Sequence, residues 1–181
     1  MPALPLAPPA GRLHAVRSVS SGDVALAVKE LAVSEEAVRE WTRGDYTISM
    51  DRARLDLDVL HGFLTNSYWG QGRSRERVAR AIEHSLPFGL YRGSQQIGFA
   101  RVLTDFVTFA LLADVFVLEP HRGHGLGKWL VETATSYSEL RAVRRFHLGT
   151  ADAHELYRKF GFAEPTPGRF LDRVNPDCDR E

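Results

Sequence analysis

Apolar residues follow two different spacings along the chain after residue 45, and each spacing predicts a different secondary structure. Apolar residues that recur at helical spacing are typical of helices with one buried face, and they occur over residues 55–68, 74–84, 126–137 and 153–160. Apolar runs bounded by turn residues are typical of strands, and they occur over residues 46–49, 87–91, 96–103, 109–118 and 145–149, with further short runs at Phe162 and at 170–174. A hairpin followed by alternating strands and helices predicts an α/β fold with a mixed sheet.

The chain before residue 45 has a different composition. Residues 1–22 are rich in Pro, Ala and Ser, which predicts disorder or loose attachment. Residues 23–43 have helical character. We therefore expect an N-terminal extension over residues 1–44, partly disordered or helical, in front of a domain over residues 45–181. We interpret the extension as a solvated segment, with a homodimer contact as the alternative.

Size and charge narrow the class of protein. A chain of 181 residues with 44% hydrophobic content can form one domain with its own core. Its 23 basic and 23 acidic residues give a formal net charge of +0, so no global field attracts it to nucleic acid or to a membrane. No apolar run approaches the ~18 residues that span a bilayer, and the N-terminus does not resemble a signal peptide. We expect a soluble cytoplasmic protein with neither nucleic acid nor membrane as a partner.

Cysteine and histidine usage predicts no metal site. The single cysteine, Cys178, excludes an internal disulfide and a cysteine-rich metal site. The histidines lack the H-x-x-x-H spacing that places two metal ligands on one helix face.

The glycine-rich run from Arg122 to Gly127, followed by Lys128, is the strongest chemical signal in the chain. It follows the apolar run 111–118 and precedes a predicted helix, so its glycines let the backbone approach a ligand closely at a helix N-terminus. Helix first turns usually carry acids. Here the charges that flank the run are basic, and the first acid of the predicted helix is Glu132. The arrangement predicts an anionic ligand, and phosphate is the obvious candidate.

The spacing of this run excludes two common phosphate loops. The P-loop pattern G-x-x-x-x-G-K-[ST] would place its first glycine at Arg122 and its hydroxyl at Trp129. The dinucleotide pattern G-x-G-x-x-G would place its third glycine at Lys128 or at Leu130.

A third pattern, [RQ]-x-x-G-x-[GA], fits residues 122–127, and it resembles the acetyl-coenzyme A loop of the Gcn5-related N-acetyltransferase (GNAT) family. Thirty residues further on, residues 153–162 resemble the second signature of this family, A-x-x-[LF]-Y-x-x-x-G-F. The resemblance extends over roughly residues 46–174. It implies a central mixed sheet of six to seven strands flanked by about four helices, with the cofactor between two central strands that splay apart.

The resemblance also implies an activity. An acetyltransferase of this family transfers the acetyl group of acetyl-CoA to a primary amine of a small molecule or a protein. We expect direct attack in a ternary complex, because no cysteine or serine is placed to form an acyl-enzyme and no G-x-S-x-G motif is present. The alternative from another class of function is a non-catalytic acyl-CoA-binding or sensing module. Mapped onto this chain, the cofactor-binding residues are Val117, Leu118, Arg122, Gly123, His124, Gly125, Leu126, Gly127, Lys128 and Asp152.

Two residues are candidates for catalysis. By the same resemblance, Tyr157 donates a proton to the leaving thiolate. Asp114 is a candidate general base, because it is a charged residue within an apolar strand, on the same face as Phe116. The alternative for Asp114 is a hydrogen-bonded structural acid. Glu119 is a weaker candidate base.

Two further acids have competing interpretations. Asp105, at a strand end, is a candidate to bind a cationic substrate, with a structural or solvated acid as the alternative. Asp152 stands where the family often has an asparagine that contacts pantetheine. Together with Glu155 it also fits a capping box, which is the interpretation that we favour.

In this family, the loop between the first two helices selects the acceptor. Within this loop, residues 66–73, Tyr68 and Trp69 are candidates to line the acceptor site, and Arg73 is a candidate to bind a carboxylate. Alternatively, the two aromatic side chains only cover the sheet.

Overall fold

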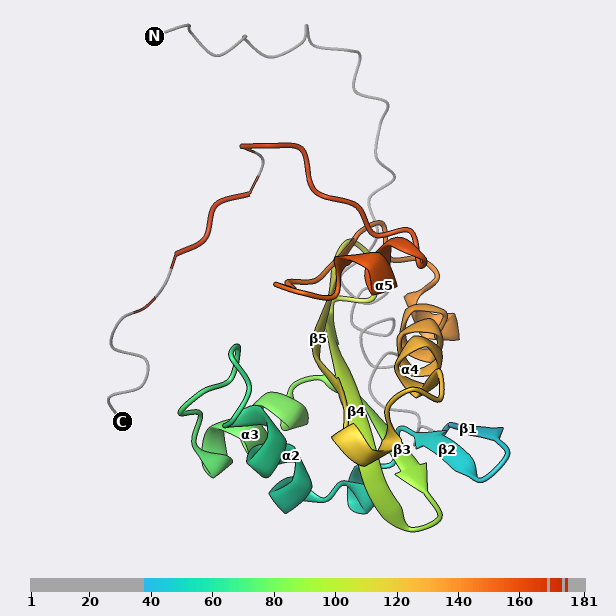
Figure 1. Cartoon of the computed structure of the whole chain (residues 1–181). Helices are drawn as coiled ribbons and strands as arrows, with labels where there is room; N and C mark the ends of the chain where they lie inside the picture. Colours follow the sequence, from blue (N-terminus) through green and yellow to red (C-terminus); the bar gives the residue numbers. More distant parts are fainter. Residues whose placement is uncertain (1–37, 169, 174, 176–181) are drawn as a thin grey trace, which may run out of the picture. The chain divides into compact units, whose positions relative to one another are not determined.

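The computed structural model describes residues 38–168, 170–173 and 175, and these contain one six-stranded sheet in the order β1-β2-β3-β4-β5-β6 (Figure 1). The strands are β1 (Glu40–Arg43), β2 (Tyr46–Ser49), β3 (Leu86–Arg92), β4 (Gln95–Thr104), β5 (Ala110–Val117) and β6 (Phe146–His147). The first five strands pair antiparallel, and β5 pairs parallel with β6. The predicted mixed α/β sheet is therefore confirmed.

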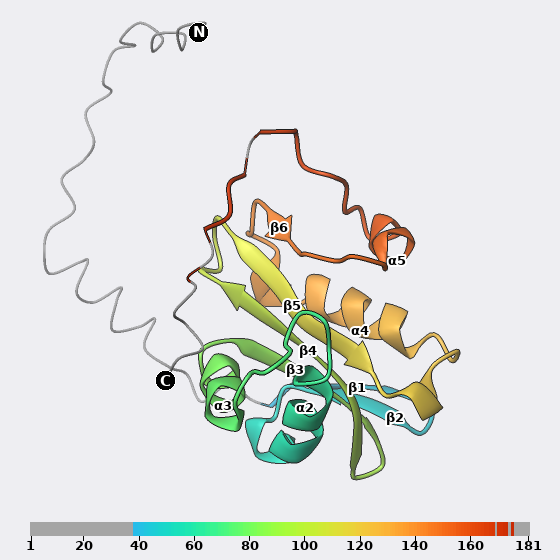
Figure 2. The ribbon, with the colours of Figure 1, turned by 60° about the vertical axis from the view of Figure 1, so that its left-hand side comes forward.

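In the part of the chain that the structure describes, four helices flank the sheet: α2 (Leu57–Leu64), α3 (Arg75–Glu83), α4 (Leu126–Thr135) and α5 (His154–Arg158). Short 3-10 turns lie at Arg52–Arg54, Glu119–His121 and Ser138–Leu140. Helices α2 and α3 lie on one face of the sheet and α4 on the other (Figure 2). None of the helices in the described ranges is long and apolar enough to cross a membrane.

The sheet separates two hydrophobic clusters. The larger cluster contains Leu126, Leu130 and Ala134 of α4 together with Phe88 of β3 and Val102 of β4. The smaller cluster lies on the opposite face and consists of Leu60, Leu64, Val78, Ile82, Phe99 and Phe116. Burying apolar side chains on both faces explains why the apolar residues of the central strands occupy consecutive as well as alternate positions.

Capping side chains set where α2 and α3 begin. Ser74 accepts a hydrogen bond from the Arg77 N–H and caps α3, as predicted. Asp56 accepts from the N–H groups of Asp58 and Val59 and starts α2 there. The predicted helix over 55–68 is therefore too long, because its last residues form the loop to α3.

The helical character predicted for residues 23–43 is wrong at its C-terminal end, where Glu40–Arg43 forms β1. Arg43 pairs with Tyr46, so β1 and β2 form a tight hairpin, and Gly44 adopts the positive φ of 57° that such turns need. Trp41 then packs against Phe88, with the ring centroids 6.1 Å apart. Cross-strand pairing and this contact decide the conformation. Residues 1–37 and Cys178 lie outside the described residues.

Two strands predicted near the C-terminus are also wrong as far as the chain is described. Neither Phe162 nor residues 170–173 lie in a strand, and Val174 is outside the described residues. Phe162 packs edge-on against Tyr157 at 6.0 Å, and Phe170 packs against His147 at 4.8 Å. These two aromatic side chains therefore pack against other rings, although their backbone does not pair with a strand of the sheet.

Candidate active site

The edge of β5 that faces β6 is open over most of its length. Strand β6 pairs with β5 only at Ala110 and Leu111. On its other side β5 continues along β4 to Val117, which lies opposite Gly98. Since the Leu118 N–H donates to the Ile97 carbonyl at 2.8 Å, the N–H and C=O of Val117 point away from β4 and toward the open edge. An extended ligand can pair with a strand edge of this kind.

A β-bulge at Asp114 shapes this edge. Phe99 pairs with Phe116, but Arg101 pairs with Ala113, so β5 carries one extra residue between these two pairs. Asp114 takes a left-handed φ of 51° at this point. The bulge breaks the strict alternation that the sequence predicts, because Ala113 now lies opposite Arg101. Bulges bend a strand and increase its twist, which fits the divergence of β5 from β6.

The glycine-rich loop follows β5 and leads into α4. Gly123 and Gly125 adopt positive φ values of 84° and 75°, and Gly125 is the N-cap of α4. A Cβ added at either glycine would meet no atom within 4 Å, so the loop borders open space. The N–H groups of residues 123–128 donate to no acceptor in the described part of the chain. The loop therefore presents a row of N–H donors, together with the positive end of a helix dipole.

The residues on either side of the glycine-rich loop make different contacts near the open edge of β5. The Arg122 Nε donates to the Val117 carbonyl at 2.9 Å, which ties a guanidinium to the end of β5. Lys128 lies in the first turn of α4, which carries no acid. Leu118 uses its N–H for Ile97 and its carbonyl for His121. Of the two strand residues predicted to bind the cofactor, only Val117 therefore points its backbone groups toward the open edge, and its carbonyl already accepts from Arg122.

Tyr157 is a nearly buried residue of α5. Burial, followed by the nearby Tyr68 and Asp152, raises the pKa of its phenol to about 12. The phenol is therefore neutral throughout the physiological range and is a proton donor. None of the hydrogen bonds among the described residues involves its hydroxyl.

The capping box predicted for Asp152 and Glu155 is wrong. The N-cap of α5 is Ala153, and no side chain caps it. The Ala153 N–H instead donates to the hydroxyl of Thr150, and Glu155 pairs with Arg158. The negative charge of Asp152 contributes to the raised pKa of the Tyr157 phenol.

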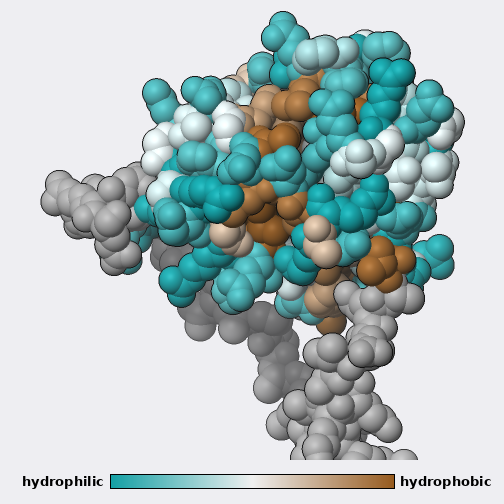
Figure 3. Space-filling view, turned by 90° about the horizontal axis from the view of Figure 1, so that it is seen from below, coloured by the Kyte–Doolittle hydropathy of each residue, from teal (hydrophilic) through white to brown (hydrophobic). Residues whose placement is uncertain are grey.

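The loop between α2 and α3 stands in front of β4 and β5 (Figure 2). The Tyr68 hydroxyl accepts a hydrogen bond from the Ala151 N–H at 2.8 Å, which joins this loop to the segment before α5. Trp69 lies 4.8 Å from Tyr68 and 6.2 Å from Phe63, which stacks on Phe116 at 3.9 Å. We call this set of four rings the aromatic row. The molecular face seen from below in Figure 1 has a band of hydrophobic side chains between hydrophilic borders (Figure 3).

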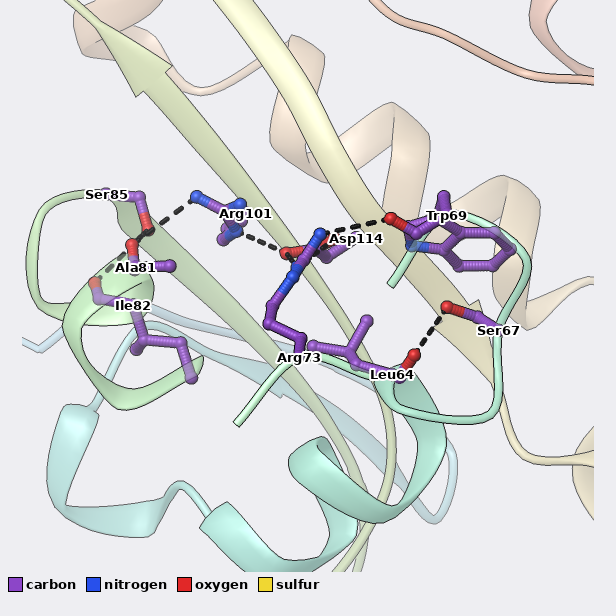
Figure 4. A network of polar contacts seen from close by, with 9 residues as sticks. All are labelled: Leu64, Ser67, Trp69, Arg73, Ala81, Ile82, Ser85, Arg101 and Asp114. Carbon is purple, nitrogen blue, oxygen red and sulfur yellow. Dashed lines mark hydrogen bonds and ion pairs between the residues drawn. The ribbon is translucent and has the colours of Figure 1, made fainter. Parts of the chain in front are cut away.

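Asp114 forms ion pairs with two arginines (Figure 4). Its side chain is only 4% exposed, and its Oδ2 lies 2.5 Å from the Arg101 Nε and 3.3 Å from an Arg73 terminal nitrogen. Arg101 was not predicted from the sequence, although a charged residue within an apolar strand was a signal for it. The structure thus brings Asp114 and Arg73 together, as parts of one charged cluster.

The other candidate acids have local roles or exposed positions. Hydrogen bonds from the Thr108 hydroxyl and from the N–H groups of Val107, Phe109 and Thr108 lower the pKa of Asp105. These bonds close the turn between β4 and β5, which explains an acid at this position. Glu119 is in the 3-10 turn after β5 and is exposed. No group of metal-ligating side chains occurs in the ranges that the structure describes.

Comparisons with known proteins agree with this geometry. The family model described as "Acetyltransferase (GNAT) domain" matches residues 83–164, which include β5, the glycine-rich loop and α5. A Gibberella zeae protein named a "putative acetyltransferase" is 31% identical over 142 residues, which is 67% of this chain and 80% of that protein.

Solved structures of acetyltransferases are also similar to this chain. A Xanthomonas campestris pv. campestris protein described as belonging to the GNAT family has a TM-score of 0.71 and 39% identity, and the match covers 75% of this chain and 97% of that one. A Clostridium acetobutylicum protein, described as a predicted acetyltransferase with acetyl-CoA, has a TM-score of 0.53 and 14% identity, over 71% of this chain and 94% of that one. At that identity the second likeness concerns the fold alone.

Proposed function

The chain belongs to the GNAT acetyltransferase family, and on that premise we propose that it transfers the acetyl group of acetyl-CoA to a primary amine by direct attack in a ternary complex. One observation carries this proposal. The open edge of β5 at Val117 leads directly into a helix N-terminus whose N–H groups, from residue 123 to residue 128, have no acceptor within the described residues. The backbone groups of a strand edge can hydrogen-bond to the amides of an extended ligand, and the row of N–H groups can bind a pyrophosphate. Acetyl-CoA contains both an amide-containing arm and a pyrophosphate.

The protein groups that hold the donor follow from this geometry. The N–H groups of the glycine-rich loop bind phosphate oxygens, and Lys128 in the first helical turn adds positive charge. Arg122, held by the Val117 carbonyl, places a second cation beside the same loop. The empty space next to Gly123 and Gly125 fits close approach of the ligand to the main chain.

Tyr157 has the chemistry needed to assist the departing thiolate. As the amine nitrogen bonds to the carbonyl carbon, the carbon–sulfur bond breaks and negative charge develops on sulfur. A phenol with a pKa of about 12 does not transfer its proton fully to a thiolate whose conjugate acid has a pKa of ~8.5. Tyr157 therefore stabilises the leaving group chiefly by donating a hydrogen bond.

The amine must be neutral when it attacks, and its surplus proton goes to solvent. Asp114 enters this proposal as a positioning residue. Its oxygens already face the guanidinium groups of Arg73 and Arg101, which makes them poorly available to a substrate proton. The general base at Asp114 stays a sequence-based prediction, and we propose an electrostatic role for Asp114 in its place.

The substitution Tyr157→Phe tests the proposed function. We expect acetyl-CoA to bind with unchanged Kd in calorimetry, while kcat for acetyl transfer falls roughly 10²–10⁴-fold. Tyr91→Phe is the matched control. The Tyr91 hydroxyl is also buried, has no hydrogen-bond partner among the described residues, and has a pKa raised to about 12. Its loss should leave kcat unchanged.

The pH dependence of the rate is a second test of the proposed role of Tyr157. Because the folded pKa of Tyr157 is about 12, the donor form persists as the acceptor amine loses its proton. The wild-type rate should therefore rise with pH and show no alkaline decline from Tyr157 below about pH 10. Unchanged kcat in Tyr157→Phe would remove the donor role, and binding of acetyl-CoA without transfer to any amine would favour the non-catalytic alternative.

A further inference from the structure

The two arginines that share Asp114 are held very differently. The Arg101 Nε lies 2.5 Å from Asp114, and the Arg101 side chain is 11% exposed. The nearest contact of Arg73 to the same carboxylate is 3.3 Å, and its side chain is 25% exposed. Charge-assisted hydrogen bonds are usually about 2.7–2.9 Å long. Arg101 is therefore the tightly bound counter-ion of Asp114, whereas Arg73 is only loosely engaged.

The cluster also has an excess of positive charge. Asp114 is the one carboxylate that pairs with Arg73 or Arg101 within the described residues, so the three side chains together carry a formal charge of +1. The other terminal nitrogen of Arg73 donates a hydrogen bond to the Trp69 carbonyl at 3.2 Å, a neutral acceptor. A partly buried cation without full compensation is costly unless a ligand supplies an anion.

The position of Arg73 links this charge to the acceptor. It belongs to the same loop as Tyr68 and Trp69, and the Tyr68 hydroxyl accepts a hydrogen bond from the Ala151 N–H, just before the helix α5 that carries Tyr157. At the C-terminal end of this loop, Arg73 contacts Asp114. Asp114 is the bulge residue of β5, and it lies in the part of β5 that does not pair with β6. The loop thus joins the segment before α5 to the charged cluster. Figure 4 shows its Arg73 end, where the guanidinium lies between the Trp69 carbonyl and Asp114.

We infer that the acceptor is a small molecule that carries a carboxylate as well as its amine, and that Arg73 binds this carboxylate. The inference rests on the proposed function and names the substrate class for it. The planar fork of an arginine matches a carboxylate with two N–H donors. The aromatic row covers the apolar part of such a molecule. A small molecule fits better than a protein segment, because the hydrogen bond between Tyr68 and Ala151 closes the loop against the segment before α5.

Paired acceptors test the inference. Glycine, β-alanine, γ-aminobutyrate and longer straight-chain ω-amino acids are each compared with their carboxamides, by thiol release from acetyl-CoA. At least one carboxylate should exceed its carboxamide in kcat/KM by roughly tenfold to hundredfold, the effect of one charge-assisted hydrogen-bond pair. Arg73→Gln should reduce that ratio to near one through KM, and Arg73→Lys should restore part of it. The comparison of ratios between variants cancels the different amine pKa values of the paired compounds.

Arg75→Gln is the matched control, since it removes the same charge two residues away. Arg75 is half-exposed and pairs with Asp58 at 2.9 Å, away from the cluster. The carboxylate preference should persist in this variant. Thermal melting of each variant verifies that it is folded.

Calorimetry separates this inference from the proposed function. Each acceptor is titrated into enzyme saturated with coenzyme A, where no transfer occurs. Carboxylate binding that depends on Arg73 supports the inference even if no acetylation follows. If no carboxylate in the series binds better than its carboxamide, or if the preference survives Arg73→Gln, the inference is overturned, while acetylation of any amine still upholds the proposed function.

Discussion

The proposed donor side and the proposed acceptor side of this site are built in opposite ways. The donor side consists of one continuous segment, residues 117–128, and it presents mainly backbone N–H groups. The acceptor side combines side chains from the α2–α3 loop, from β4 and from β5, and it depends on aromatic packing and paired charges. The difference indicates that the donor side depends on a few backbone conformations, whereas the acceptor side depends on contacts between distant residues.

Among the substitutions proposed for the two sides, we expect the largest effect from Asp114→Asn, which lowers stability at the acceptor side. In Asp114→Asn the side chain keeps its shape and the tolerance of asparagine for positive φ, but two arginines lose their counter-ion. We expect the free energy of unfolding to fall by about 3 kcal/mol, as for other broken buried pairs. Urea denaturation measures the change.

Asp58→Asn is the control for this substitution. It removes an equivalent acid from the exposed pair with Arg75 and should cost at most about 1 kcal/mol. Equal losses in the two variants would show that the Asp114 cluster has no special electrostatic role.

The second effect concerns the donor side and should appear in ligand binding. Gly125 has a φ of 75° and lies at the N-cap of α4. Asp and Asn tolerate this conformation about equally well, so comparing Gly125→Asp with Gly125→Asn isolates the negative charge. A carboxylate beside the pyrophosphate should weaken acetyl-CoA binding roughly hundredfold relative to Gly125→Asn.

Calorimetry with acetyl-CoA measures this difference. Equal affinity of the two variants would mean that the loop does not bind the phosphates. Loss of carboxylate recognition in Gly125→Asn, with acetyl-CoA binding retained, would break the division into donor and acceptor sides.

The smallest effect is expected at the contact that joins the loop to the segment before α5. Tyr68→Phe removes the acceptor of the Ala151 N–H, in a half-exposed position where one hydrogen bond contributes about 1 kcal/mol. The KM of the acceptor should rise roughly threefold to tenfold, while the Kd of acetyl-CoA stays constant. Steady-state kinetics measures the first quantity and calorimetry the second. The reverse pattern would assign Tyr68 to the donor side.

Local signals in the sequence predicted the parts of the molecule that depend on neighbouring residues. The run from Arg122 to Gly127 correctly predicted a turn before a helix, and Ser74 correctly predicted the start of α3. Where pairing with a distant strand competes with local spacing, the prediction was wrong. Trp41 belongs to a strand because it meets Phe88, a residue far along the chain.

The candidate site divides along the same line. The loop residues and Tyr157 were predicted through two contiguous motifs. The capping role of Asp152 was wrong, because Thr150 supplies the oxygen that binds the Ala153 N–H. The pairing of Asp114 with Arg101 was missed, since it depends on the bulge that sets which residues of β4 and β5 face each other.

The sequence by itself determined the mixed α/β fold, the family and the segment that we propose to bind the donor. These follow from hydrophobic spacing and from motifs whose residues act within one turn or one strand. Only the tertiary structure decided the electrostatics of the acceptor side. The ion pairs that Arg73 and Arg101 form with Asp114 depend on distances across two strands and a loop, and no spacing along the chain encodes those distances.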